Sequence, residues 1–416
     1  MPGLPAVLPV ARVAVDSGLA HLDRPFDYAV PAALDAAQAG CRVRVRFAGR
    51  QVDGIVLERV AVSAHAGALT PLLALVSAEP VLHPEVAALC RAVADRCAGA
   101  LWDVLRFAVP PRHARVEAEP RPYGPLALPP VPAAGSWQRY PAGAAFLAAL
   151  TAGRAPRAVW CALPGPSWPE EVALAVRACV AGGRGALVVV PDARDCERVA
   201  AALGELDTAV LRADLGPAKR YRAFLRARRG EVRVVLGTRA AAFAPVHELG
   251  LVVVWDDGDD QHAEPRAPYP HARDVLVQRA HLAGAASLVG GHARTAEGQL
   301  LVDTGWARSL VAGREQVRAV APRVDGTSDD DLVRDPLARA ARLPGLAFEA
   351  ARSSLASGAP VLVQVPRRGY IPSLACARDG AAARCGRCAG PLAAAGRGAT
   401  TACGWCGALA GDWRCP

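Results

Sequence analysis

Lysine is almost absent from this sequence. Lys219 is the only lysine among 416 residues, and 47 arginines supply the rest of the basic charge. A phosphate site that depends on a lysine ammonium group is therefore excluded almost everywhere in the chain. The formal net charge is +9, and guanidinium groups can contact phosphate through two hydrogen bonds. This composition favours a nucleic-acid partner, although a basic enzyme without such a partner has the same charge.

Long apolar runs are also missing. No stretch of about 18 apolar residues occurs, so no membrane-spanning segment and no membrane partner are expected. No signal peptide is expected at residues 1–5, because no basic segment precedes an apolar stretch there. We expect a cytoplasmic chain that is long enough for about two to four domains.

Residues 158–172 have the pattern of a strand, a loop and a helix, which is where a nucleotide-binding domain holds phosphate. A working loop reads G-x-x-x-x-G-K-[ST], because backbone N–H groups and a lysine must reach the phosphates. Gly165 and Ser167 fit such a loop, but Trp168 stands at the lysine position and Pro169 at the hydroxyl position. The proline also removes a backbone N–H. We interpret the segment as a degenerate nucleotide site, at which ATP is a doubtful ligand.

The hydrophobic pattern predicts an α/β multidomain fold. Short apolar segments alternate with amphipathic ones from residue 157 onward, which is typical of a parallel sheet covered by helices. The predicted strands of this region are 158–163, 186–190, 232–236, 251–255 and 286–289. Nearer the N-terminus, strict alternation predicts half-buried strands of a small β domain. These strands are 11–16, 41–47 and 51–57, and a helical stretch follows at 86–98.

One of these strands carries a row of arginines. Arg42, Arg44 and Arg46 alternate with apolar residues, so all three are expected on one face of the strand. Such a row can follow a phosphate backbone. A solvated strand face without a ligand explains the pattern equally well.

Half of the 12 cysteines lie between residues 376 and 415. Four of them have the spacing Cys385-x2-Cys388-x14-Cys403-x2-Cys406, which suits tetrahedral zinc held by four thiolates. Disulfides are not expected in a cytosolic chain. The sequence therefore predicts one closed, structural zinc site with no catalytic role.

The N-terminal region resembles a known family. The segments His21-Leu-Asp-Arg-Pro-Phe-Asp-Tyr28, Gly40-Cys-Arg-Val-Arg-Val-Arg-Phe47 and Val52-Asp-Gly-Ile-Val56 are similar to the N-terminal domain of the PriA family (primosomal protein N′) of replication restart helicases. The resemblance implies a domain that holds the free 3′ end of a nascent strand at a stalled fork. It implies that Asp27, in the Phe-Asp-Tyr motif, contacts the 3′ terminus. Arg24 and the Arg42, Arg44 and Arg46 row are expected to hold the preceding phosphates.

The resemblance continues into a RecA-like lobe through Gly237-Thr-Arg239, Leu249-Gly-Leu251 and His271-Ala-Arg-Asp274, but the ATPase motifs differ from the family pattern. Trp255, Asp256, Asp257 and Gly258 stand where the family has Asp-Glu-Glu-His. Gly290-Gly-His-Ala-Arg294 replaces Gly-Ser-Ala-Thr-Pro. We assign Asp256 and Asp257 to the degenerate nucleotide site. Asp256, Asp257, Asp259 and Asp260 could still gather a metal ion, but a solvated acidic turn is the interpretation that we favour for these four residues.

The resemblance implies a second zinc site. It is built from a second pair of knuckles, which are turns that carry two metal ligands at C-x2-C spacing, and this pair flanks the first pair in the sequence. In this chain Cys376 and Cys415 remain, and Asp379 takes the place of a cysteine. A weak, partial zinc site and an empty one are both compatible with these residues. Family members continue through most of a second lobe, so we expect this sequence to be a fragment.

The expected division of the chain follows from these motifs. It is a 3′-end-binding domain (1–108), a proline-rich linker with a possible winged-helix remnant (109–152), a degenerate helicase lobe (153–335), the start of a second lobe (336–375) and a cysteine-rich zinc region (376–416). The leading hypothesis is a replication restart protein that binds DNA forks, 3′ ends and single strands, and recruits primosome and replication proteins without helicase activity. The alternatives are an ATP-dependent 3′→5′ DNA helicase with divergent loops and a generic zinc-ribbon module.

Overall fold

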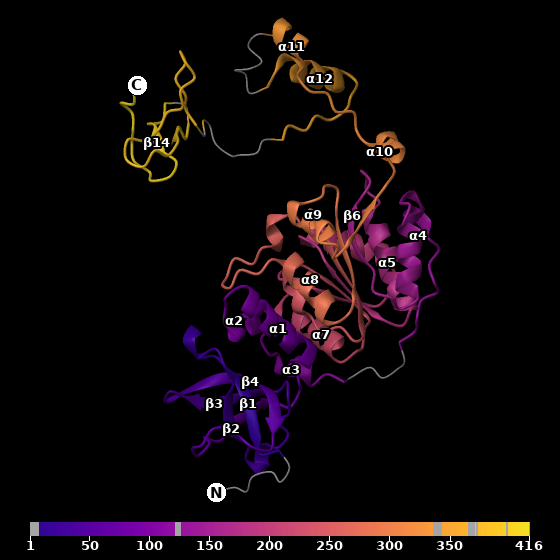
Figure 1. Ribbon diagram of the computed structural model, residues 1–416, viewed down its shortest axis with the longest axis vertical. Helices are drawn as coiled ribbons and strands as arrows, with labels where there is room; N and C mark the ends of the chain where they lie inside the picture. The colour runs from indigo at the N-terminus through magenta and orange to yellow at the C-terminus, as the bar shows by residue number, and fades with distance from the viewer. Residues whose placement is uncertain are drawn as a thin grey trace. The chain divides into compact units, whose positions relative to one another are not determined.

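The computed structural model describes residues 8–120, 126–335, 343–364, 371, 373–396 and 398–415. The chain forms two compact units, 1–322 and 323–416. The first unit contains an antiparallel sheet, a group of short helices and a parallel sheet (Figure 1). The predicted α/β multidomain fold is confirmed.

The antiparallel sheet has five strands in the order β2-β1-β4-β3-β5. They are β1 (Val10–Val15), β2 (Phe26–Ala29), β3 (Arg42–Phe47), β4 (Arg50–Val60) and β5 (Ala74–Ser77). Ala48 and Gly49 join β3 to β4, and both have positive φ angles, as a two-residue hairpin requires. Val43 and Val45 are buried, whereas Arg44 and Arg46 are exposed, so the expected alternation is confirmed. The sequence pattern did not reveal β2 and β5.

Three helices connect this sheet to the rest of the unit. They are α1 (Pro84–Arg96), α2 (Leu101–Ala108) and α3 (Ala114–Glu117). Proline suits the first turn of α1 because no intrahelical donor is lost there, and the His83 side chain caps the Glu85 N–H at 3.3 Å. Buried residues of α1 and α2 join those of the parallel sheet in one continuous apolar core.

The parallel sheet has seven strands in the order β12-β6-β11-β10-β7-β9-β8. They are β6 (Arg157–Cys161), β7 (Gly185–Val189), β8 (Thr208–Leu211), β9 (Val234–Gly237), β10 (Leu249–Trp255), β11 (Ala286–Gly291) and β12 (Arg308–Val311). Five of them lie where the sequence predicted strands. The sequence analysis missed β8 and β12, which are short strands at the two edges of the sheet.

Helices cover both faces of this sheet (Figure 1). They are α4 (Gly143–Thr151), α5 (Trp168–Ala181), α6 (Ala193–Leu203), α7 (Pro217–Arg228), α8 (Ala272–Leu282) and α9 (Ala296–Asp303). On β7, Leu187 and Val189 join the core on the side of α7 and α8, whereas Ala186 and Val188 join the core on the side of α4, α5 and α6. Burial on both faces explains why the central strands read as continuous apolar runs.

The segment predicted as a proline-rich linker is anchored to the parallel sheet. It contains a short 3-10 helix, η3 (Gly135–Arg139), which precedes α4. Trp137 of η3 is fully buried, and its Nε1 donates a hydrogen bond to the Glu171 carbonyl of α5 at 2.8 Å. The possible winged-helix remnant thus packs as part of the α4–α5 layer, and the described residues of 109–152 contain no strand.

After α10 (Arg314–Val320), the second unit contains few regular elements. They are α11 (Asp329–Arg334), α12 (Gly345–Ala356), β13 (Leu392–Ala393) and β14 (Ala402–Cys403). Within the segment expected to start a second lobe (336–375), residues 361–364 have no regular structure and 365–370 lie outside the described residues. Throughout the described ranges, no helix combines the length and apolarity needed to cross a membrane.

We predict that Arg279→Ala lowers the free energy of unfolding by about 2–4 kcal/mol. Arg279 of α8 is 1% exposed, pairs with Glu85 of α1 at 3.4 Å and donates to the Ala242 carbonyl at 2.9 Å. Alanine would leave a cavity and an unpaired buried carbonyl. Urea unfolding followed by circular dichroism measures the change. The control Arg226→Ala removes an exposed pair with Asp207 and should cost less than about 1 kcal/mol; equal losses for both variants would contradict the prediction.

Candidate functional sites

Two tryptophan side chains stack on each other in the segments that the sequence analysis interpreted as a degenerate nucleotide site. Trp168 is the first residue of α5, directly after β6 and its loop, and it is 2% exposed. Its ring stacks on Trp255, the last residue of β10, with centroids 4.1 Å apart and planes 7° apart. Arg198 of α6 lies 5.0 Å over the Trp168 ring. The side chain at the lysine position is therefore part of the apolar core instead of reaching toward a phosphate.

The loop before α5 is held by contacts within the protein. The Ser167 hydroxyl accepts a hydrogen bond from Arg139 Nη2 at 2.8 Å, and Arg139 also pairs with buried Glu171. Burial raises the pKa of Glu171. Gly165 has φ of +128°, a conformation open only to glycine, so the loop keeps the flexible position of a phosphate loop. The Ser167 hydroxyl, Arg139 and Glu171 nevertheless form hydrogen bonds and an ion pair with one another.

The two aspartates after β10 are not arranged as metal ligands. Asp257 is 4% exposed, accepts a hydrogen bond from Thr295 Oγ1 at 2.7 Å and pairs with Arg273 at 3.2 Å. Asp256 has a positive φ of 52°. Its pKa is raised, mainly by burial and secondly by the negative charge of the nearby Asp259. Neither belongs to a group of described side chains with metal-ligand spacing. The ion pair with Arg273 balances the charge of the buried Asp257 carboxylate.

Asp27 lies on β2, directly opposite Arg12 of β1. Its carboxylate lies 3.5 Å from Arg12 Nε and accepts a hydrogen bond from the Ser63 hydroxyl at 2.6 Å. The side chain remains 14% exposed. Arg12 also pairs with Glu58 of β4 at 2.7 Å, so the three charged groups cross three neighbouring strands. The sequence analysis overlooked Arg12 and Ser63; the only signal for Arg12 was its polar position within an alternating strand.

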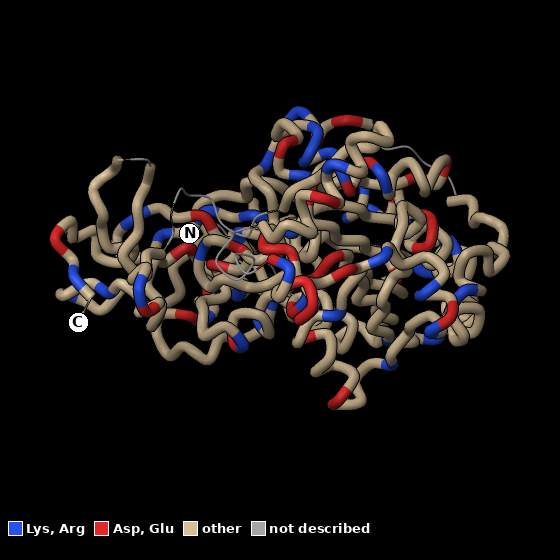
Figure 2. The backbone as a smooth tube through the Cα atoms, turned by 90° about the horizontal axis from the view of Figure 1, so that it is seen from above, with Lys and Arg blue, Asp and Glu red and all other residues tan. Residues whose placement is uncertain are grey.

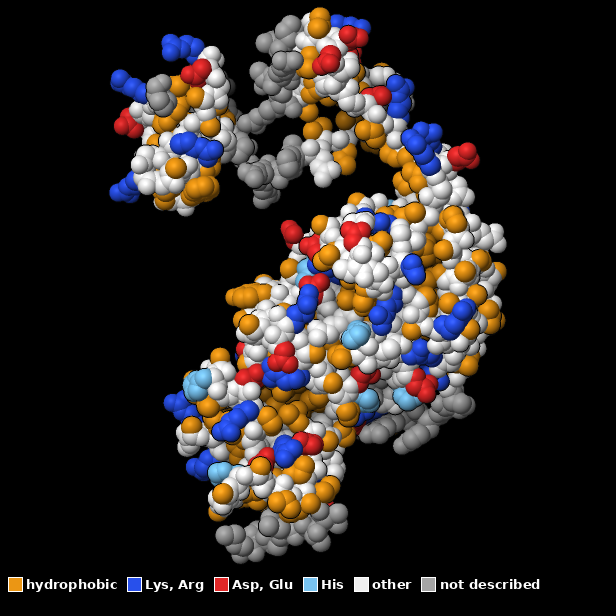
Figure 3. All heavy atoms as spheres, in the orientation of Figure 1, with side chains coloured by type: hydrophobic (Ala, Val, Ile, Leu, Met, Phe, Trp, Pro, Cys, Tyr) orange, Lys and Arg blue, Asp and Glu red, His pale blue; other side chains and the backbone are white. Residues whose placement is uncertain are grey.

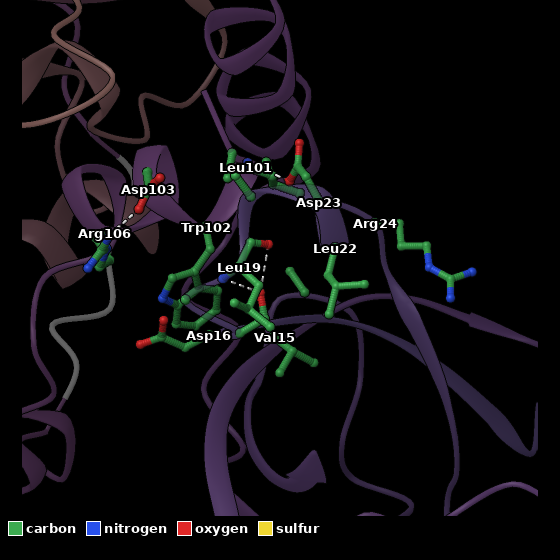
Figure 4. A pocket seen from close by; sticks show the side chains of 15 residues that line it. Val15, Asp16, Leu19, Leu22, Asp23, Arg24, Leu101, Trp102, Asp103 and Arg106 are labelled. Atoms are coloured by element: carbon green, nitrogen blue, oxygen red, sulfur yellow. Dashed lines mark hydrogen bonds and ion pairs between the residues drawn. The ribbon is translucent and has the colours of Figure 1, made fainter. Parts of the chain in front are cut away.

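Arg24 lies beside the Phe-Asp-Tyr motif, with its guanidinium carbon 5.1 Å from the centre of the Phe26 ring. It also lines a hollow of about 200 Å³ between residues 14–24 and 100–106, but Figure 4 shows its guanidinium pointing away from Trp102. Asp23 fixes this segment, because its carboxylate accepts from the Leu101 N–H at 2.7 Å and from Arg91 at 2.6 Å. Arg24 is therefore placed next to the strand that carries Asp27.

The three arginines of β3 share one face of the strand but differ in environment. Arg42 donates a hydrogen bond to the Pro110 carbonyl, and burial lowers its pKa. Arg44 pairs with Asp53 of β4 at 3.1 Å, and both side chains are exposed. Arg46 is exposed and has no ion pair among the described residues. The row is thus not a uniform phosphate-binding surface, and Arg44 and Arg46 are its accessible members.

Charge is mixed over the rest of the molecule. Basic and acidic residues alternate along the backbone in Figure 2, and the face drawn in Figure 3 mixes them with hydrophobic side chains. Neither view shows a face with a single sign of charge.

The four central cysteines come together as predicted. The Sγ atoms of Cys385, Cys388, Cys403 and Cys406 all lie within 4.8 Å of one another. Backbone N–H groups of Cys406 and Trp405 lower the pKa of Cys403 to about 6, which favours the thiolate. A set of four converging sulfur atoms, one of them readily deprotonated, fits a metal ion with tetrahedral coordination.

A second group combines Cys376, Asp379 and Cys415, whose ligand atoms also lie within 4.8 Å of one another. The segment from Cys376 to Asp379 has the same backbone turn as the two C-x2-C knuckles of the four-cysteine group. Each turn ends at a residue with positive φ, namely Gly380, Ala389 and Gly407. Each of these residues donates its N–H to the carbonyl of the residue four positions earlier, at 2.9–3.0 Å. The aspartate therefore occupies a ligand position in a fully formed knuckle.

Comparisons with known proteins agree with the N-terminal motifs. Residues 12–110 match the PriA 3′DNA-binding domain (3′BD) family. The chain is 55% identical over 405 residues to the probable replication restart protein PriA of Mycobacterium tuberculosis, covering 95% of this chain and 62% of that protein. The corresponding protein of Mycobacterium leprae is 53% identical over 406 residues, with the same coverage. The chain thus spans less than two thirds of the length of these relatives.

Among solved structures, RecG bound to a three-way DNA junction matches with a TM-score of 0.32 and 16% identity, over 49% of this chain and 25% of that chain. This likeness is too low to support an argument about function. The family comparison rests on two other findings. Residues 12–110 match the 3′DNA-binding domain family, and 95% of the chain aligns with the Mycobacterium tuberculosis protein at 55% identity. They confirm that this chain resembles the PriA family of replication restart proteins.

Proposed function

We propose that this chain binds branched DNA that carries a free 3′ end and takes part in replication restart without acting as a helicase. The observation that carries the proposal is the position of Asp27, an oriented and partly exposed carboxylate within the region that matches the 3′DNA-binding domain. Primosome and replication proteins would be its partners. Its place of action would be the cytoplasm.

The contacts of Asp27 suit recognition of a terminal hydroxyl. An ionised carboxylate only accepts hydrogen bonds, and it has more lone pairs than Ser63 and Arg12 use. Those two neighbours hold the carboxylate in one orientation, so a 3′-OH would meet a preorganised acceptor. A 3′-phosphate would be repelled by the negative charge. A continuing strand would place another phosphate in the same position.

Nearby arginines would supply most of the affinity. Arg24, Arg44 and Arg46 are accessible basic groups of this region, whereas Arg42 is engaged with the Pro110 carbonyl. Contacts of this kind are electrostatic and independent of base sequence, so binding should weaken as salt rises.

The helicase alternative is disfavoured by the stack of Trp168 on Trp255. ATP-driven movement needs a loop that cradles the phosphates and a carboxylate that holds Mg²⁺. In this chain the lysine position belongs to the apolar core, and Asp257 is neutralised by Arg273. A non-hydrolysing DNA-binding role therefore accounts better for the residues present.

We further propose that the metal of the four-cysteine group is zinc, because four thiolates in two C-x2-C knuckles form its preferred closed site. Cys376, Asp379 and Cys415 would hold a second zinc ion more weakly, because a carboxylate replaces one thiolate. Both ions would stabilise the second unit and would not take part in chemistry.

Metal analysis tests the zinc proposal. We expect at least one zinc per chain in the purified protein, and Cys388→Ser should remove the tightly bound ion because three thiolates leave the shell incomplete. The control Cys179→Ser changes a buried cysteine of the parallel-sheet core and should leave the zinc content unchanged. Undiminished zinc in Cys388→Ser would rule out the assignment.

We predict that the protein neither binds nor hydrolyses ATP at millimolar concentration, with or without forked DNA. The loop lacks the lysine, the hydroxyl and the metal-binding aspartate that place charge around the γ-phosphate. Calorimetric titration with Mg·ATP tests binding, and phosphate release tests turnover. Turnover that rises on addition of forked DNA would support the helicase alternative instead.

The 3′-end proposal predicts a preference of roughly tenfold for forks ending in 3′-OH over forks ending in 3′-phosphate, as expected from one charged hydrogen bond. Asp27→Ala and the isosteric Asp27→Asn should lose this preference and keep most of the salt-dependent affinity. The control Asp53→Ala removes an exposed carboxylate of the same sheet and should keep the preference. Fluorescence anisotropy with both fork types measures the ratio. Equal binding of the two forks by the unmodified protein would refute the proposal.

A further inference from the structure

A cavity of about 230 Å³ lies at the carboxyl edge of the parallel sheet. Its wall includes η4 (Arg239–Phe243), which follows β9, and the segment that follows β10. Helices α2 and α7 contribute further residues. The cavity is lined by four arginines: Arg106, Arg220, Arg239 and Arg266. We call it the Arg220 pocket.

The charge in the Arg220 pocket is mostly positive. Glu264 is the only carboxylate among its lining residues, and it is 7% exposed. Its two oxygens are used by Arg239 Nε at 3.0 Å and Arg266 Nε at 2.9 Å. Arg106 is paired with Asp103, which adds one more carboxylate nearby. Four guanidinium groups thus face two carboxylates, and a positive charge remains.

Arg220 is the group without a counter-ion. Among the described residues, no hydrogen bond or ion pair is found for its guanidinium, which also borders the neighbouring cavity near Phe224. Burial and the nearby charge of Arg266 lower the pKa of Arg220, but an arginine remains protonated in proteins. The Arg220 side chain is half-buried, so its charge is available to an anion that enters the pocket.

The size and the aromatic lining of the pocket narrow the choice of anion. Typical small-molecule sites measure about 300–1,000 Å³, so the pocket suits one group of a larger ligand better than a whole nucleotide. Phe107 and Phe243 form apolar walls, and Arg266 lies 5.2 Å over the Phe107 ring. Arginines next to aromatic rings are the combination that holds single-stranded nucleic acid.

The pocket also touches the region that matches the 3′DNA-binding domain. Arg106 and Phe107 belong to α2, which lies within residues 12–110 and packs against η4. We propose that the Arg220 pocket binds one phosphodiester group of a single DNA strand. Another part of the same strand would contact the N-terminal antiparallel sheet. This inference rests on the proposed function, since it needs DNA as the ligand.

The test measures anisotropy of labelled oligo-dT over a range of salt concentrations. Arg220→Ala should weaken binding about five- to tenfold and reduce the slope of log K against log salt by about 0.7, the value for one lost single-strand phosphate contact. Arg266→Ala should weaken binding about two- to threefold, because its side chain is 74% exposed. The matched control Arg226→Ala changes the same charge on the same helix outside the pocket, and should leave the slope unchanged.

Three outcomes would overturn the inference. The first is an unchanged slope in Arg220→Ala, and the second is an equal change of slope in Arg226→Ala. The third is tight binding of inorganic phosphate that depends on Arg220 while oligo-dT binding does not, which would make the pocket a site for free phosphate. Unfolding curves show whether Arg220→Ala is folded, and Arg266→Ala provides the test if it is not.

The same variants separate this inference from the 3′-end proposal. Arg220→Ala should retain the preference for 3′-OH over 3′-phosphate, because Asp27 is unchanged. If the unmodified protein shows no preference for 3′-OH, the 3′-end proposal fails. The salt-dependence slope of Arg220→Ala would still show whether the Arg220 pocket binds a phosphate of single-stranded DNA.

Discussion

A single apolar core runs from α1 and α2 into the parallel sheet, and the arrangement of the first unit depends on it. Leu89 of α1, Val104 of α2 and Val252 of β10 belong to the same cluster of buried residues. Two arginines form ion pairs at the junction: the partly buried Arg229 pairs with Glu79 at 3.0 Å, and the buried Arg279 pairs with Glu85. Such pairs are costly to break once they are removed from water. Ala14 and Ile55 of the antiparallel sheet also belong to this cluster, so the core continues into the proposed DNA-binding sheet.

The carboxyl edge of the parallel sheet has two different environments. At β6 and β10 the edge is apolar, because Trp168 and Trp255 stack on each other there. Beside β9, the edge and α2 enclose the arginines of the Arg220 pocket. In parallel α/β sheets, ligands bind beyond the carboxyl ends of the strands. Here the apolar part of that edge contributes stability, and the basic part is the one suited to an anion.

The second unit follows a different physical principle. Its cysteine-rich segment has only two strands of two residues each, and its small cluster of buried residues includes Cys385 and Cys403 themselves. So little apolar burial cannot offset the loss of chain entropy. Metal ligation supplies free energy to domains of this kind. The converging sulfur atoms are thus the main source of order that we expect for this segment.

Local patterns in the sequence determined much of this architecture. Alternation of valines with arginines predicted β3, and the continuous apolar runs predicted the central parallel strands, because burial on one or both faces leaves a direct mark on composition. Knuckle spacing predicted which cysteines converge. Edge strands such as β12 leave a weaker mark, since three of its four residues are exposed. Tertiary structure alone decided that Trp168 stacks on Trp255, that half-buried Arg42 bonds to the Pro110 carbonyl, and that Arg220 has no counter-ion among the described residues. These features depend on contacts between segments distant in sequence, and neither periodicity nor spacing specifies which distant side chains meet.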